Sequence, residues 1–117
     1  MESIAIILRR PPYGDISAAE AVRHALGALG EDIKVSLIML DSGVFVSLKN
    51  QRAEGTGFTN LADALKDSIE MGVEVYADKH SLKDALIEPE EMVDGIKIAN
   101  GSELSEIIKE ASAVMIF

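Results

Sequence analysis

The first strand-like segment constrains the fold most strongly. Residues 4–8 are all apolar, three of them are isoleucine, and apolar and polar positions do not alternate. A strand with this pattern is buried on both faces, and such strands belong to parallel sheets that helices cover. Further strands are predicted at residues 35–40, 73–77, 96–99 and 113–117. We therefore expect a mostly parallel sheet of about five strands.

Segments with helical periodicity separate these strands. Residues 17–20 read Ser-Ala-Ala-Glu, a capping box in which a hydroxyl and a carboxylate bind the first backbone N–H groups of a helix. Apolar residues follow at helical spacing up to Gly30. A second capping box is predicted at residues 81–84, where it opens a short helix through Ile87. Further helices are predicted from Leu61 to Gly72, from Pro89, and after Asn100.

Strand and helix alternate along the whole chain, which is the pattern of an α/β domain with helix layers around the sheet. Residues 44–48 fit either a short helix or a strand, and residues 50–60 are polar and glycine-rich, as in a loop. The 117 residues contain no internal repeat and no linker. The length therefore predicts a single domain over residues 1–117.

The charge balance argues against several classes of partner. Eleven Lys and Arg stand against 20 Asp and Glu, for a net charge of −9. Such a chain repels phosphate backbones and anionic membranes, so we expect no direct nucleic-acid or membrane binding. The N-terminal apolar run has five residues, whereas a signal peptide needs about 7–15 and a membrane span about 18 or more. A cytoplasmic protein is the expectation.

The chain contains no cysteine. It therefore has no disulfide, no thiolate metal ligand and no thiol nucleophile. Its five methionines carry thioethers, which form no persulfide and are typical core residues. Residues 55–57 lack the third glycine of a dinucleotide fingerprint, and no phosphate-loop motif occurs. No cofactor is predicted.

Ligands of open parallel sheets bind beyond the carboxyl ends of the strands. Here those ends lead into residues 9–15, 41–43, 77–81 and 100–102. Arg9 and Arg10 offer guanidinium forks that suit an anion, although they also fit solvated charges that close a strand. Tyr13 lies in a proline-rich turn that either presents its ring to a partner or is purely structural.

Catalytic chemistry has little support in this pattern. Ser42 follows Asp41, but a nucleophilic serine needs a positioned base, and the chain has only two histidines. His24 falls on the polar face of the first helix and is predicted to be a surface residue. His80 lies near Asp78 and could serve as a base or metal ligand, but a loop or cap residue is the more ordinary interpretation of a single histidine beside carboxylates. No catalytic residue and no metal site are assigned.

Several segments taken together resemble the DsrE/DsrF-like family, and within it the DsrF or TusC type of subunit. The first strand is followed by Pro-Pro-Tyr-Gly at residues 11–14 and an alanine-rich helix. Residues 41–45 read Asp-Ser-Gly-Val-Phe, which is similar to the family's Asp-Gly-Val-Phe/Tyr segment with Ser42 added. Residues 81–83 read Ser-Leu-Lys after the third strand, and the last strand ends in Phe117.

The resemblance implies an α/β/α sandwich that assembles into oligomers and works in sulfur transfer. Active members of the family carry a persulfide on a cysteine just after the third strand, about where Ala77 or Asp78 stands here. DsrF/TusC-type subunits do without that cysteine and serve as assembly partners. The missing cysteine fits a non-catalytic subunit, and it fits equally a relative that no longer takes part in sulfur chemistry.

Two functional hypotheses result. The first is a cysteine-free subunit that acts by assembly in sulfur transfer, as a homo-oligomer or with a cysteine-bearing DsrE-like chain. Its binding or interface residues are predicted to be Arg10, Tyr13, Asp41, Phe45, Asp78 and His80. The alternative is a homo-oligomeric protein that binds a small anion, or a weak enzyme, using the same strand-end crevice with Arg9 or Arg10 and with His80 as base.

Overall fold

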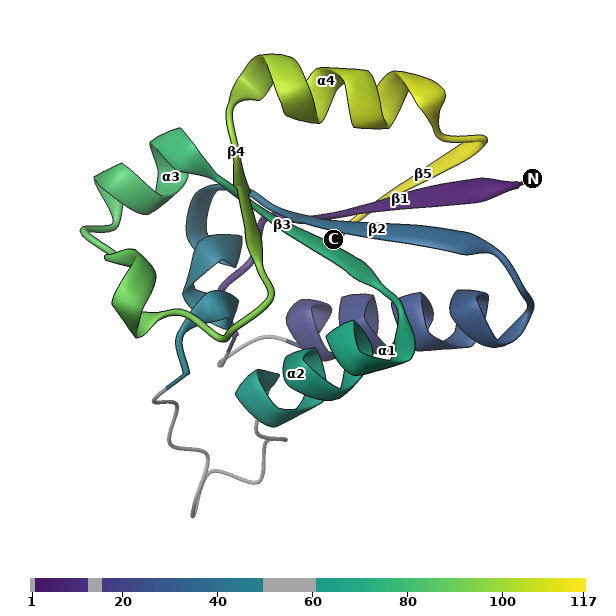
Figure 1. The fold of residues 1–117 in the computed structure, drawn as a ribbon, viewed down its shortest axis with the longest axis horizontal. Coiled ribbons are helices and arrows are strands. Elements are labelled where there is room, and N and C mark those ends of the chain that lie inside the picture. Colours follow the sequence, from purple (N-terminus) through teal and green to yellow (C-terminus); the bar gives the residue numbers. More distant parts are fainter. Residues whose placement is uncertain (1, 13–15, 50–60) are drawn as a thin grey trace.

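A computed structural model describes residues 2–12, 16–49 and 61–117 of the chain (Figure 1). The strands are β1 (Ser3–Leu8), β2 (Lys34–Met39), β3 (Glu74–Asp78), β4 (Lys97–Ala99) and β5 (Ala113–Ile116). The α-helices are α1 (Ser17–Gly30), α2 (Leu61–Met71), α3 (Lys79–Asp84) and α4 (Gly101–Glu110). Two 3₁₀ helices, η1 (Asp41–Ser47) and η2 (Pro89–Glu91), complete the described elements.

The predicted parallel sheet is confirmed. Over the described residues, the five strands run parallel in the order β4-β3-β2-β1-β5. The two most apolar strands, β1 and β2, therefore lie inside the sheet, as their continuous apolar sequences require. The short β4 and the exposed β5 form the two edges.

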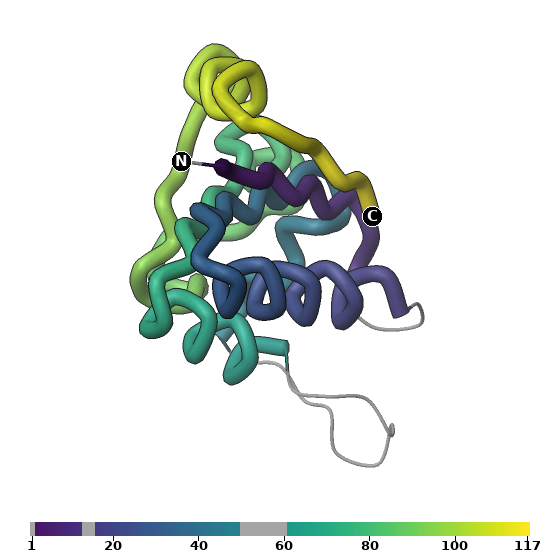
Figure 2. Tube along the Cα trace, turned by 90° about the vertical axis from the view of Figure 1, so that its right-hand side faces the viewer, coloured from purple at the N-terminus to yellow at the C-terminus, as the bar shows by residue number. Residues whose placement is uncertain are grey.

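Helices cover the sheet on both faces and make an α/β/α sandwich. Figures 1 and 2 show α1 and α2 together below the sheet and α4 above it. The elements η1 and α3 lie side by side at the carboxyl ends of β1, β2 and β3. None of the helices among the described residues is both long and apolar enough to cross a membrane.

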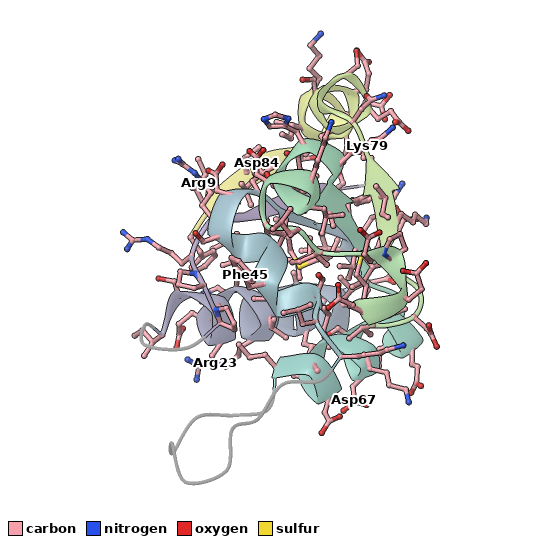
Figure 3. The ribbon with its side chains drawn as sticks, turned by 90° about the vertical axis from the view of Figure 1, so that its left-hand side faces the viewer. Arg9, Arg23, Phe45, Asp67, Lys79 and Asp84 are labelled. Carbon is pink, nitrogen blue, oxygen red and sulfur yellow. The ribbon has the colours of Figure 1, made fainter. Side chains whose placement is uncertain are left out.

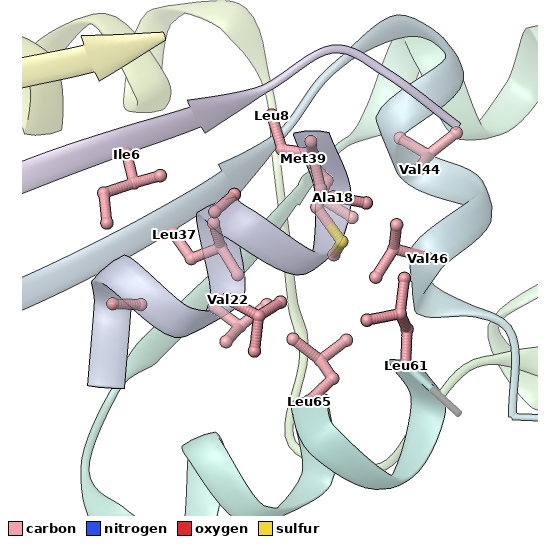
Figure 4. Packing of buried hydrophobic residues seen from close by; sticks show 14 of the residues in the cluster. Ile6, Leu8, Ala18, Val22, Leu37, Met39, Val44, Val46, Leu61 and Leu65 are labelled. Atoms are coloured by element: carbon pink, nitrogen blue, oxygen red, sulfur yellow. The ribbon is translucent and has the colours of Figure 1, made fainter. Parts of the chain in front are cut away.

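The larger hydrophobic core lies between the sheet and the helix pair α1 and α2 (Figure 4). Alternate residues of β2, among them Leu37 and Met39, point to this side and are fully buried. They meet Val22 of α1 and Leu65 of α2, while Val44 and Val46 of η1 close the core at one end. The η1 segment is therefore held by the same core as the helices.

A smaller core lies on the opposite face, under α4. Ile7 and Ile38 pack there against Leu104, and Ala99 of β4 completes the buried set. Ile7 and Ile38 belong to the carboxyl halves of β1 and β2. The amino halves of the strands on this face are not part of either core cluster.

Two predicted helix starts are wrong. The first helix begins at Ser17 with the apolar Ile16 as its N-cap, so Ser17 lies inside the helix instead of capping it. The third helix begins at Lys79, because the carboxylate of Asp78 accepts a hydrogen bond from the Ser81 amide and caps the helix three residues before the predicted cap, Ser81. The helix predicted after Asn100 is confirmed, and Asn100 caps it with Glu103 as its partner.

The segment after β2 is the 3₁₀ helix η1, which settles the choice left open for residues 44–48. Its far end is tied to η2 by the Val93 amide, which donates to the Ser47 carbonyl at 2.7 Å, and by an antiparallel bridge between Leu48 and Met92. The loop predicted at residues 50–60 and the turn around Tyr13 lie outside the described residues.

Gly43 of η1 packs directly against the end of β1. A Cβ atom at this position would lie 2.1 Å from the Leu8 carbonyl oxygen, which is a backbone atom and cannot rotate away. Gly43→Ala is therefore expected to lower the free energy of unfolding by roughly 3 kcal/mol, at the upper end of overpacking costs. Denaturant unfolding monitored by circular dichroism measures the loss.

Gly27→Ala provides the matched control, because a Cβ at Gly27 of α1 would meet nothing within 4 Å. It is expected to raise the free energy of unfolding by roughly 0.5–1 kcal/mol, the usual gain from replacing a helix glycine. Equal stabilities of the two variants would contradict the close approach of η1 to β1.

Candidate functional site

Because η1 follows β2 and α3 follows β3, the two elements lie together at the carboxyl end of the sheet. Figure 3 looks onto this end, with Phe45 on η1 and with Arg9 and Asp84 near the adjoining strand and helix ends. At the start of η1 the backbone of Asp41 has a φ of +50°, a left-handed conformation that aspartate tolerates better than most residues. The turn directs the chain away from the sheet and toward α3.

A buried serine joins the two elements. The Ser81 hydroxyl accepts a hydrogen bond from the Asp41 amide at 2.9 Å and donates one to the Asp78 carboxylate at 2.7 Å. The same carboxylate accepts from the Ser81 amide at 3.0 Å. Because Ser81 is 7% exposed and its hydroxyl already has two partners, it acts as a structural link and not as a nucleophile.

A crevice of about 340 Å³ lies between η1 and α3, and we call it the η1–α3 crevice. It brings together four of the six residues predicted from the sequence, namely Asp41, Phe45, Asp78 and His80. Ser42, Ser81, Asp84 and Ala85 complete its lining. Phe45 also lines the crevice and is 37% exposed.

Arg10 lies in a neighbouring hollow that shares Asp41 with the crevice. This hollow is lined by Arg9, Arg10, Asp41, Ile116 and Phe117. Arg9 Nε donates to the Asp41 carboxylate at 3.0 Å, so the charge of that arginine is matched within the site. Tyr13, the sixth predicted residue, lies outside the described residues.

His80 stands on the solvent side of the crevice. Its Nε2 lies 3.3 Å from an Asp84 carboxylate oxygen, and the two side chains are 80% and 68% exposed. A histidine with this exposure is hydrated and is not held in the fixed geometry that general-base catalysis needs. No group of three or more His, Asp or Glu side chains that could hold a metal ion occurs within the described part of the chain.

Sequence reasoning missed the central role of Ser81, which it treated only as a helix cap. The signal was present in the Asp78–Ser81 spacing, since an aspartate three residues before a serine is itself a helix-capping pattern. The bond from Asp41 to Ser81 spans 40 residues and has no sequence signal.

The parallel sheet, its two helix layers and the crevice at the carboxyl ends of the strands define an α/β/α sandwich with a strand-end site. A model of the DsrE/DsrF-like family matches residues 2–117. The chain belongs to the DsrE/DsrF-like family, as the resemblance in its sequence implied.

Three relatives align with nearly the whole chain. The uncharacterized protein MJ0989 of Methanocaldococcus jannaschii is 33% identical over 96% of this chain and 96% of its own length. Protein MK0008 of Methanopyrus kandleri is 30% identical over 100% and 95%. The intracellular sulfur oxidation protein DsrF of Allochromatium vinosum is 28% identical over 93% and 91%.

Solved structures agree on the fold. The crystal structure of the ychN protein from E. coli superimposes with a TM-score of 0.91 at 24% identity, covering 100% of both chains. MTH1491 from Methanobacterium thermoautotrophicum gives a TM-score of 0.75 at 11% identity, covering 98% of this chain and 99% of that one. At these identities the likeness establishes the fold alone.

Ser81→Ala tests whether this hydroxyl holds the crevice together. The change leaves the Asp41 amide without its acceptor, so the free energy of unfolding is expected to fall by about 1–3 kcal/mol. Hydrogen exchange should show the Asp41 amide proton exchanging at least roughly tenfold faster, whereas the Leu40 amide, bonded to Leu8, should be unaffected.

The exposed Ser105 of α4 supplies the control. Ser105→Ala should change stability by less than about 0.5 kcal/mol. If Ser81→Ala unfolds at the same denaturant concentration as Ser105→Ala, the hydroxyl does not link η1 and α3.

Proposed function

We propose that this chain is a cysteine-free, non-catalytic subunit of a DsrE/F-type assembly that acts by protein–protein contact in intracellular sulfur transfer. The observation that carries the proposal is the similarity to the sulfur oxidation protein DsrF over 93% of a chain without cysteine. Sulfur transfer requires a thiolate that attacks a persulfide. In such an assembly another chain must supply that thiolate.

The last two residues of β3 support a structural role at this point of the chain. By the family resemblance, the persulfide cysteine of active members falls at about Ala77 or Asp78. Ala77 is fully buried in the larger core, and the Asp78 carboxylate caps α3 through both Ser81 contacts. Neither side chain can carry a sulfur atom, and both are engaged in holding the fold.

The η1–α3 crevice has features that suit a contact with another chain. Phe45 exposes an aromatic ring, and Arg10 lies in the adjoining hollow. Aromatic and arginine side chains are the residue types that most often dominate interface energies. The crevice and hollow also contain paired charges, such as Arg9 with Asp41, which can be covered at less cost than unpaired ones.

The alternative, a small-anion site at Arg9 or Arg10, has less support. An anion at Arg9 would have to displace the Asp41 carboxylate 3.0 Å from its Nε. Asp41, Asp78 and Asp84 all line the η1–α3 crevice and would repel a negative ligand.

Recovery from the native host tests the assembly directly. The tagged chain, purified at low ionic strength, should bring with it a cysteine-bearing DsrE-like protein in stoichiometric amount, because weak polar interfaces survive best with little salt. Native mass spectrometry then gives the composition of the complex. Recovery of this chain alone, or only with copies of itself, would reject the partner subunit.

Phe45→Ala tests the crevice as the contact surface. Losing an aromatic anchor should weaken assembly by roughly tenfold or more while the circular dichroism spectrum stays unchanged. Tyr13→Ala, chosen from the sequence, is expected to act in the same direction. Met71→Ala is the control, because Met71 is also a large exposed apolar residue, at 65%, but lies at the end of α2. If Phe45→Ala and Met71→Ala change the native mass equally, the η1–α3 crevice is not the contact surface.

A further inference from the structure

A second hollow lies at the opposite end of the sheet, beneath α4. Its volume is about 230 Å³, and we call it the α4 groove. It is lined by Ser3, Ile4, Ala5, Lys34, Ser36, Glu74, Tyr76, Ile107, Glu110 and Ala111. Its floor is the amino half of the sheet face, outside the smaller core, and Ile107 and Glu110 of α4 form one wall.

The floor of the α4 groove contains a buried hydroxyl without a partner. Ser36 is 7% exposed and lies on the same face of β2 as Ile38, which packs under α4. Among the residues that the structure describes, none forms a hydrogen bond with its side chain. A buried hydroxyl without a partner is costly, so a bound molecule that forms a hydrogen bond with it would stabilise the folded state. By contrast, the buried Ser47, Ser68 and Ser81 hydroxyls all have partners.

Charged residues of both signs are neighbours of Ser36 in the sheet. Glu74 is the direct neighbour of Ser36 in the β2–β3 register, at a strand spacing of about 4.8 Å. Lys34 lies two residues earlier on the same face of β2, about 6.6 Å along the strand. Ala5, the neighbour of Ser36 on β1, is small and fully buried, and it lines the floor beside Ser36.

The charged side chains of the α4 groove carry both signs. Glu74 accepts a hydrogen bond from the Tyr76 hydroxyl at 3.2 Å and lies 3.9 Å from Lys97 Nζ. Burial and the neighbouring Glu74 raise the pKa of Tyr76, so its hydroxyl stays a donor at neutral pH. In the lining of the groove, Lys34 is the cation and Glu74 and Glu110 are the anions.

We propose that the α4 groove binds a small zwitterion of the amino-acid class. Ser36 provides a hydrogen bond at the floor, Lys34 binds the carboxylate, and Glu74 binds the ammonium group. A simple anion or cation would meet a like charge on one side, and an apolar group would leave the Ser36 hydroxyl unsatisfied. The volume holds a molecule of this size, since it corresponds to several waters of about 30 Å³ each. This inference does not rest on the proposed role in sulfur transfer.

Thermal unfolding of the full chain with each of the twenty amino acids, tested singly, is the first experiment. At least one is expected to raise the unfolding midpoint, because a ligand that binds only the folded state stabilises it. For that amino acid, calorimetry should show binding at least tenfold weaker for its amide, which lacks the carboxylate charge, and for its N-acetyl derivative, which lacks the ammonium charge.

Three variants locate the site. Ser36→Ala and Lys34→Gln should each weaken binding by roughly ten- to a hundredfold, the usual effect of losing a hydrogen bond to a charged group. Without ligand, Ser36→Ala should be at least as stable as the natural chain, because it removes an unsatisfied buried hydroxyl. Lys66→Gln, on the exposed side of α2, should bind normally.

The outcomes separate this inference from the proposed function. Absence of a shift with all twenty amino acids, or binding that survives both Ser36→Ala and Lys34→Gln, overturns the zwitterion site. Native mass spectrometry of the same variants reports on assembly through the η1–α3 crevice, which lies at the other end of the strands. A failure to bind amino acids therefore does not bear on the proposed assembly, and a failure to assemble does not bear on amino-acid binding.

Discussion

The geometry of the strand-end crevice depends on the carbonyl group of Leu8 at the end of β1. Its oxygen accepts the Leu40 amide at 2.9 Å and so fixes where β2 ends. Gly43 packs against the same carbonyl so closely that no side chain fits between them. Because η1 starts at this point, the contact also determines where Phe45 is presented and whether the Asp41 amide reaches Ser81.

The polar groups of the crevice have partners close by. Asp41 faces Arg9, Asp84 lies 3.3 Å from His80, and the Asp78 carboxylate accepts hydrogen bonds from both polar groups of Ser81. Arg9 and Asp41 form an ion pair, which another chain can cover at less electrostatic cost than an unpaired charge.

The two ends of the sheet offer different surfaces. The carboxyl end presents Phe45 among paired charges. The amino end has a polar floor around Ser36, with charges of both signs on the rim. The two ends differ because Leu104 of α4 packs on Ile7 and Ile38 at the carboxyl end of this sheet face, whereas residues earlier in the strands line the α4 groove. One helix layer thus both completes the smaller core and forms the wall of a separate groove.

The local sequence was enough to predict the elements and the class of fold. Uninterrupted apolar runs such as residues 4–8 favour strands inside a helix-covered parallel sheet, and the meeting of Asp41, Phe45, Asp78 and His80 at the carboxyl end of the sheet was predictable from the same pattern. The start of α3 was predicted wrongly, because Asp78 caps the helix in place of Ser81. The local sequence carries no signal for the strand order, the link from Asp41 to Ser81 or the burial of the Ser36 hydroxyl, which tertiary packing sets. Periodicity reports which face of an element is apolar, whereas these features depend on which distant element packs against that face.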